Sequence, residues 1–120
     1  MILVIDDEFA IRTLIRTVLE EHGYQVLEAA DGTEGLRMVH EQPVKLVITD
    51  VVMPDKGGIE LLMELRKEFK NLAIILMSGK IETDADSFQE LAAQFGVLAV
   101  LTKPFKMSRL LAVVEQSLNR

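Results

Sequence analysis

The sequence predicts an α/β fold in which five short strands alternate with five helices, giving a doubly wound parallel sheet with helices on both faces. Short apolar runs rich in valine and isoleucine recur along the chain, as is typical of strands that are covered on both sides. Patterns with helical spacing lie between these runs. At 120 residues the chain is long enough for one core, and we expect a single domain over residues 1–120.

Five runs predict the strands. Four of them are almost wholly apolar and indicate buried strands: Ile2–Ile5, Leu46–Thr49, Leu72–Met77 and Val97–Leu101. The fifth run, Tyr24–Ala29, mixes Gln25 and Glu28 into its apolar residues, which favours a half-covered edge strand. We expect no chemistry from this edge strand.

Apolar residues three and four positions apart predict the helices. The first set begins at Ile11 and continues to Leu19, and Gly23 follows as a stop signal. The same spacing predicts a helix that ends at Gly96 and another at the C-terminus, and two weaker patterns complete the series: Phe88–Phe95, Met107–Leu118, Thr33–Gln42 and Gly58–Phe69.

Composition excludes several functions. The chain carries 19 acidic and 13 basic residues, a formal net charge of −6, and we expect no direct nucleic-acid binding because phosphate contacts depend on basic patches. The longest apolar run, Leu72–Met77, has six residues, whereas a membrane span needs about 20. No basic region precedes the first apolar residues, so we expect a cytoplasmic protein without a membrane partner. The absence of cysteine excludes disulfides and thiol chemistry.

Polar side chains follow each of the four buried strands, at the edge of the sheet where open α/β folds collect their chemistry. In chain order the residues at these strand ends are Asp6, Asp7 and Glu8, then Asp50, then Ser78 with Gly79, and finally Thr102 and Lys103 with Pro104. Three carboxylates brought together at the rim of an apolar core repel one another. The repulsion must be relieved by a bound proton or by a cation, and hard oxygen ligands suit Mg²⁺.

Four motifs carry a resemblance to a known family: "VIDDE" at Val4–Glu8, "VITDVVMPDKGGIEL" at Val47–Leu61, "MSG" at Met77–Gly79 and "LTKPF" at Leu101–Phe105. Together and in this order, the motifs resemble those of the receiver domain of two-component response regulators, over essentially the whole chain. The resemblance implies the flavodoxin-like strand order 2-1-3-4-5, in which the first and fourth strands flank the strand that bears Asp50.

The resemblance also implies roles for the site residues. Asp7 and Asp50 are expected to bind Mg²⁺ directly, together with the backbone carbonyl of Val52, and Asp6 acts mainly through water. Asp50 is the expected phosphoacceptor, phosphorylated by a sensor histidine kinase, a phosphotransfer protein or a small phosphodonor.

Lys103 and Ser78 are expected to contact the phosphoryl oxygens, with Ser78 as the sensor of phosphorylation. We predict a cis peptide bond between Lys103 and Pro104, which aims the amine inwards. The domain is expected to hydrolyse its own aspartyl phosphate slowly rather than to turn over a substrate.

Some positions depart from the family pattern. Val100 stands where many receivers carry a Tyr or Phe that swings inwards, so signalling would run through the loop after Ser78. Val52 cannot orient an attacking water and Lys80 could pair with the phosphate, which predicts slow hydrolysis.

The partners downstream of phosphorylation stay open: an unknown target protein, an output domain, or a second copy. A second copy would bind through the fourth and fifth helices and the fifth strand expected from the sequence, at Phe88–Phe95, Met107–Leu118 and Val97–Leu101. The sequence is equally compatible with a single-domain regulator and with the receiver part of a longer chain.

Other interpretations of the same residues stay open too. Asp7 could cap the first helix, and His22 and His40 read as helix-surface residues. An aspartyl phosphatase would carry a second acid at position 52, where this chain has Val52. An interaction module that is never phosphorylated would not need Asp7, Asp50, Ser78 and Lys103 together, and no glycine-rich nucleotide-binding motif is present.

Overall fold

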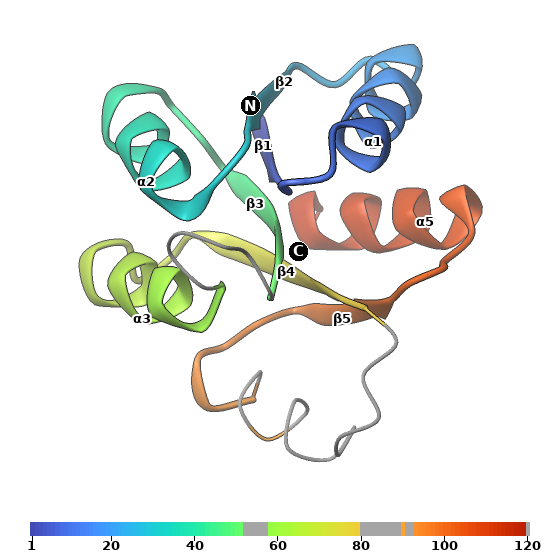
Figure 1. Ribbon diagram of the computed structural model, residues 1–120. Helices are drawn as coiled ribbons and strands as arrows, with labels where there is room; N and C mark the ends of the chain where they lie inside the picture. Colours follow the sequence, from blue (N-terminus) through green and yellow to red (C-terminus); the bar gives the residue numbers. More distant parts are fainter. Residues whose placement is uncertain (52–57, 80–89, 91–92, 120) are drawn as a thin grey trace.

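The fold is a five-stranded parallel sheet between two layers of helices (Figure 1). The structure is a computed structural model that describes residues 1–51, 58–79, 90 and 93–119. Neighbouring strands are hydrogen-bonded in the order β2-β1-β3-β4-β5, which confirms the predicted doubly wound, flavodoxin-like topology. The strands are β1 (Ile2–Ile5), β2 (Val26–Ala29), β3 (Leu46–Asp50), β4 (Ala73–Ser78) and β5 (Ala99–Thr102).

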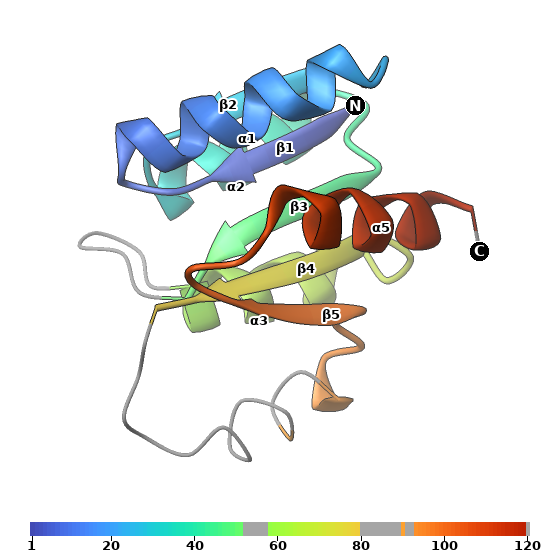
Figure 2. The same ribbon diagram turned by 90° about the vertical axis from the view of Figure 1, so that its right-hand side faces the viewer.

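The helices lie in pairs on the two faces of the sheet, with α1 and α5 on one face and α2 and α3 on the other (Figure 2). Their bounds are α1 (Phe9–Glu21), α2 (Gly32–Glu41), α3 (Gly58–Glu68) and α5 (Met107–Leu118). These bounds lie within about two residues of the sequence predictions. Half of the residues of the helix expected at residues 88–95 fall outside the described residues.

Alternation along the strands divides the core into two parts. Ile2 and Val4 of β1 pack with α1 and α5, whereas Leu3 and Ile5 pack with α2 and α3. All four side chains are almost completely buried. A central strand covered on both sides in this way explains why β1 is apolar throughout, as predicted.

Local signals set the ends of the helices. Asp31 caps α2, since its Oδ1 accepts a hydrogen bond from the backbone N–H of Glu34 at 2.8 Å. Gly23 follows α1 with φ of 89°, a left-handed conformation that glycine adopts without steric cost. The residue at the N-cap of α1 is Glu8 and not Asp7, and its backbone N–H donates to Asp6 Oδ1 at 2.9 Å.

The strand register brings the predicted site to one edge of the sheet. Asp50 is the last residue of β3 and lies opposite Met77, and Ser78, the last residue of β4, lies opposite Thr102. Asp6 directly follows β1, whose last residue Ile5 pairs with Thr49. The chain therefore delivers side chains from four parallel strands to their common carboxyl edge. None of the helices in the part of the chain described above has the length and apolar character needed to cross a membrane.

Candidate functional site

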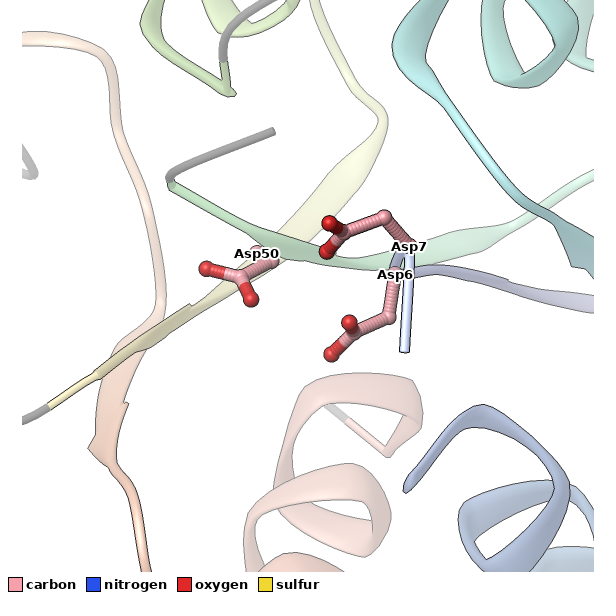
Figure 3. A group of neighbouring side chains, drawn as sticks. All are labelled: Asp6, Asp7 and Asp50. Carbon is pink, nitrogen blue, oxygen red and sulfur yellow. The ribbon is translucent and has the colours of Figure 1, made fainter. Parts of the chain in front are cut away.

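Three carboxylates gather at the carboxyl edge of the sheet. Asp6 and Asp7 follow β1, Asp50 ends β3, and one oxygen from each of the three lies within 4.8 Å of the others. Figure 3 shows the side chains of Asp6 and Asp7 reaching from the end of β1 towards the side of Asp50. Asp6 is fully buried, Asp50 is 6% exposed and Asp7 is exposed, so the group opens to solvent on the side of Asp7.

The amine of Lys103 reaches back from the end of β5 to two of these carboxylates. Its Nζ lies 2.7 Å from Asp50 Oδ2 and 2.7 Å from Asp6 Oδ2, with Glu8 Oε1 further away at 3.9 Å. The backbone N–H of Lys103 donates to the carbonyl of Ser78 at 2.7 Å, which fixes where the side chain begins. The peptide bond between Lys103 and Pro104 is cis, which confirms that prediction.

Lys103 is a charged partner for the acids. Burial alone would lower the pKa of its amine, but the hydrogen bonds to Asp50 and Asp6 outweigh burial and hold this pKa above its usual value. The ammonium form is therefore the one that faces the two carboxylates at neutral pH. The repulsion between the carboxylates is therefore reduced by the ammonium of Lys103 as well as by any bound proton or metal ion.

The donor set fits a small divalent cation. One ammonium among three carboxylates leaves the group net negative, and hard carboxylate oxygens are the ligands that Mg²⁺ prefers. Both oxygens of Asp6 already have partners, since Oδ1 accepts from Glu8 and Oδ2 from Lys103. The carboxylate of Asp7 is exposed, and that of Asp50 is buried with its Oδ2 bonded to Lys103. The backbone carbonyl of Val52, the third expected ligand, falls outside the described residues.

The remaining predicted residues lie as follows. Ser78 is 6% exposed and belongs to the strand next to Asp50, one residue beyond the register partner of Asp50. It is the last residue of β4 rather than the first residue after it. Val100 is partly buried and packs against the core below α2 and α3. Lys80 falls outside the described residues.

The two histidines are exposed, as expected. His22 contacts the carbonyl of Val18 at 2.9 Å, and Nε2 of His40 lies 3.0 Å from Glu68 Oε2 between α2 and α3. These contacts account for both rings without a metal.

An arginine that the sequence did not single out touches the backbone of the site. Arg12, in the first turn of α1, donates from Nη1 to the carbonyl oxygen of Asp6 at 2.7 Å and from Nε to Glu28 Oε1 at 2.9 Å. Arg16 binds the other oxygen of Glu28 at 2.9 Å. The edge strand β2, from which no chemistry was expected, therefore supports the site through Glu28.

The alternation of side chains along β2 is the sequence signal that could have predicted this contact. Glu28 lies two residues after Val26, so both side chains point to the face that α1 covers. A carboxylate on a covered face needs a partner. The hydrogen bonds from Arg16 and Arg12 outweigh the effect of burial and hold the pKa of Glu28 below its usual value.

Comparison with known proteins places the chain in one family. The chain belongs to the family of response regulator receiver domains, whose model matches residues 2–115. This family is the receiver of two-component signalling, and membership supports a phosphoacceptor role.

Two relatives agree with this family assignment. The chain is 38% identical over 118 residues to the DNA-binding transcriptional regulator NtrC of Azospirillum brasilense, covering 98% of this chain and 24% of the relative. It is 33% identical over 119 residues to the aerobic respiration control protein ArcA of Escherichia coli, covering 99% of this chain and 48% of ArcA. The chain thus spans about a quarter to a half of the length of these relatives.

Solved structures of about the same length show the same fold. The crystal structure of a response regulator receiver domain protein from Clostridium thermocellum superposes with a TM-score of 0.88 at 36% identity, covering 99% of this chain and 94% of that one. Chemotaxis protein CheY4 of Vibrio cholerae gives a TM-score of 0.88 at 27% identity, covering 97% and 96% of the two chains.

Proposed function

We propose that Asp50 accepts a phosphoryl group in a Mg²⁺-dependent reaction, and that phosphorylation controls a protein partner. The observation that carries the proposal is the placement of Lys103 Nζ at 2.7 Å from both Asp50 and Asp6, beside the carboxylate of Asp7. An acceptor, a cation and an open acidic position then lie together at one rim, which is what phosphoryl transfer onto a carboxylate requires.

The transfer needs little covalent chemistry from the protein. A carboxylate oxygen of Asp50 attacks the phosphorus of a phosphohistidine, an O–P bond forms and the P–N bond breaks. The electron pair of the P–N bond stays on the imidazole nitrogen, which takes up a proton from solvent. Charge spreads over the equatorial oxygens of the phosphoryl group in the transition state, so positioned cations accelerate the step.

Asp7 and Asp50 would hold Mg²⁺, and Asp6 would orient bound water. A magnesium ion there supplies charge neutralisation for the phosphoryl oxygens. Lys103 would leave the Asp50 carboxylate for one phosphoryl oxygen, and the Ser78 hydroxyl would donate to another. Because the phosphoryl group adds about −1.5 to −2 charge, these two contacts would draw the ends of β4 and β5 towards Asp50.

This movement would alter the surface around β5, α5 and the helix expected at residues 88–95, where a target, an output domain or a second copy would bind. Val100 has no polar tip and only one torsion, so the movement would pass through the backbone after Ser78. We propose no stand-alone turnover: the domain accepts a phosphoryl group and slowly hydrolyses it.

The phosphodonor would dock beside Lys103. A largely apolar hollow of about 410 Å³ adjoins the amine between α1 and the start of α5. Two large apolar side chains of α1 are solvent-exposed nearby, Phe9 at 70% and Leu14 at 49%. A sensor kinase or phosphotransfer protein that covers these side chains would bring its phosphohistidine to Asp50. The apolar side chains that line the hollow are those of Ile11, Leu14, Pro104, Phe105 and Met107.

Incubation with acetyl phosphate and Mg²⁺, followed by intact-mass measurement, tests the proposal. We expect a gain of one phosphoryl group in the wild type and none in Asp50→Asn. The matched control is Asp31→Asn, which changes an aspartate that caps α2, and it should still gain the group. Steady turnover of a phosphoester would instead indicate an enzyme. No adduct under any condition would indicate an interaction module that is not phosphorylated.

A further inference from the structure

The backbone of Asp6 is held from two sides. Its N–H donates to the carbonyl of Ala29 on the edge strand at 3.2 Å, and its carbonyl accepts from Arg12 Nη1 at 2.7 Å. The second bond is charge-assisted and therefore stronger than a neutral one. The peptide group before Asp6 is thus tied to β2, and the peptide group between Asp6 and Asp7 is tied to α1 through its carbonyl oxygen.

This peptide unit determines the direction of Asp7. A peptide group is planar, so fixing the carbonyl oxygen of Asp6 also fixes the nitrogen and the Cα of Asp7. Asp6 is buried and its carboxylate has partners of its own, whereas Asp7 is exposed. The direction of the Asp7 carboxylate towards Asp50 therefore depends on the position of the backbone of Asp7.

The guanidinium of Arg12 is itself immobilised. Its Nε binds Glu28 Oε1 at 2.9 Å, the side chains are only 13% and 19% exposed, and Arg16 holds the other oxygen of Glu28. Glu28 sits on a strand paired with β1 in register, Val4 opposite Glu28. A planar fork whose donors are set by a fixed carboxylate can orient a carbonyl more closely than a flexible ammonium can.

We propose that Arg12 is a positioning residue for the cation site: it sets the Asp6–Asp7 peptide so that the Asp7 carboxylate faces Asp50, and Glu28 holds Arg12 in place. The inference rests on the proposed function, in which these carboxylates bind Mg²⁺. The loss of Arg12 should change the affinity for Mg²⁺ in opposite directions, depending on whether Arg12 acts through its charge or through positioning. A nearby positive charge repels Mg²⁺, so on Coulombic grounds alone the loss of Arg12 would tighten binding.

Calorimetric titration with Mg²⁺ alone separates the two effects. In Arg12→Met, which keeps an apolar stem and loses every donor, we expect the dissociation constant to rise about tenfold, the lower end of the effect of losing a group that orients a metal ligand. The matched control is Arg16→Met. This variant removes one positive charge from the same helix, together with a hydrogen bond to the same Glu28 carboxylate. Arg16 has no bond to Asp6, so the dissociation constant for Mg²⁺ should stay unchanged or fall.

A measurement on the metal-free protein tests the geometry directly. The ¹⁵N shift of the Asp7 amide reports the hydrogen bond on the preceding carbonyl, and we expect it to move in Arg12→Met and to stay in Arg16→Met. Arg12→Lys keeps the charge but replaces two separate donor nitrogens by a single ammonium on a flexible stem, and it should restore part of the affinity. With acetyl phosphate, Arg12→Met should need more Mg²⁺ for the half-maximal rate and reach a similar rate at saturation.

Two outcomes would overturn the inference. If Arg12→Met binds Mg²⁺ as tightly as Arg16→Met, or more tightly, Arg12 acts only through its charge or its packing. If Arg12→Met does not fold, the same comparison is made with Arg12→Lys, whose affinity and Asp7 shift must then differ from those of Arg16→Met. A wild type without affinity for Mg²⁺ would instead defeat the proposed function itself.

Discussion

Lys103 Nζ lies 2.7 Å from Asp50 Oδ2, so the expected phosphoacceptor is already paired with a cation of the protein. The same amine lies 2.7 Å from the fully buried Asp6. A buried carboxylate that lost this partner would keep its charge without compensation, which is costly. We therefore expect Lys103 to stabilise the fold in addition to its proposed role in phosphoryl transfer.

Replacing Lys103 by methionine should lower the free energy of unfolding at pH 7 by about 2–3 kcal/mol, somewhat less than the loss from breaking a fully buried pair, because the acids open to water at Asp7. Added Mg²⁺ should recover part of this loss, since a bound divalent ion offsets the same negative charge. Urea unfolding followed by circular dichroism, with and without Mg²⁺, measures both effects.

Lys106→Met is the control for this variant. Lys106 directly precedes α5 and is exposed. Its replacement by methionine removes the same charge as Lys103→Met from the same part of the chain. Its loss should change stability by no more than about 0.5 kcal/mol. Equal losses in the two variants would show that Lys103 acts only through net charge.

The acid limb of stability should depend on Glu28. Its folded-state pKa lies below the usual value of 4.5 because the hydrogen bonds from Arg16 and Arg12 outweigh burial. Between the two pKa values the unfolded chain binds more protons, so the stabilisation is fully present above about pH 4.5 and is lost as the pH falls through the lower, folded-state pKa.

The difference in unfolding free energy between wild type and Glu28→Gln should therefore be constant near neutrality and shrink below pH 4.5. Urea titrations over this pH range measure it. As a control, Glu41→Gln removes one partner of an exposed pair with Arg37, which should cost no more than about 0.5 kcal/mol at pH 7. A gap that widened on acidification would contradict the assignment of Glu28.

The fold followed from local patterns because three of the five strands, β1, β3 and β4, are buried along their whole length. The prediction of a buried strand at Val97–Leu101 was wrong, since β5 lies at the edge of the sheet and only Leu101 in it is buried. Ile2–Ile5 reads as one apolar run since β1 packs against helices on either side. The half-covered strand was harder to place: its regular part begins at Val26 rather than at Tyr24. The strand order came from the family resemblance and not from the apolar pattern, which carries no information about which strands are neighbours.

The site was predictable where residues stand at strand ends, as Asp50 does. It was less predictable where a long side chain crosses to another element. Sequence spacing does not reveal that Lys103 contacts Asp6, 97 positions away, or that Arg12 grips the carbonyl of Asp6. Such contacts depend on side-chain reach and on the depth of the rim, and both are fixed only once the sheet is assembled.

The lifetime of the phosphoryl group should depend on position 52. Val52 offers no hydrogen bond to an attacking water, so Val52→Asn should lose the group severalfold faster than the wild type. Decay of the phosphorylated mass after removal of acetyl phosphate measures this. Lys80→Met should also shorten the lifetime, if Lys80 pairs with the phosphate. Both positions fall outside the described residues, and a wild type that decays faster than Val52→Asn would refute the idea.

Arg66 ties three segments together at the opposite edge of the sheet. Its Nε donates to the carbonyl of Phe95 at 2.7 Å, and Nη1 donates to the carbonyls of Lys70 and Leu72, each at 2.9 Å. One guanidinium thus joins the C-terminal end of α3, the turn before β4 and the segment before β5. These carbonyls cannot pair within a helix, and a fork of fixed donors suits them.

Arg66→Lys should therefore lower the free energy of unfolding by about 2 kcal/mol, because a single ammonium cannot reach all of these acceptors and charge-assisted hydrogen bonds are lost. Lys67→Ala, on the exposed neighbour, should change it by no more than about 0.5 kcal/mol. Affinity for Mg²⁺ should stay at the wild-type value in Arg66→Lys, since the hydrogen bonds of Arg66 lie at the amino ends of the strands and the three aspartates at their carboxyl ends. A variant that kept its stability but lost Mg²⁺ affinity would mean that the two edges of the sheet are coupled, against the independence that this geometry predicts.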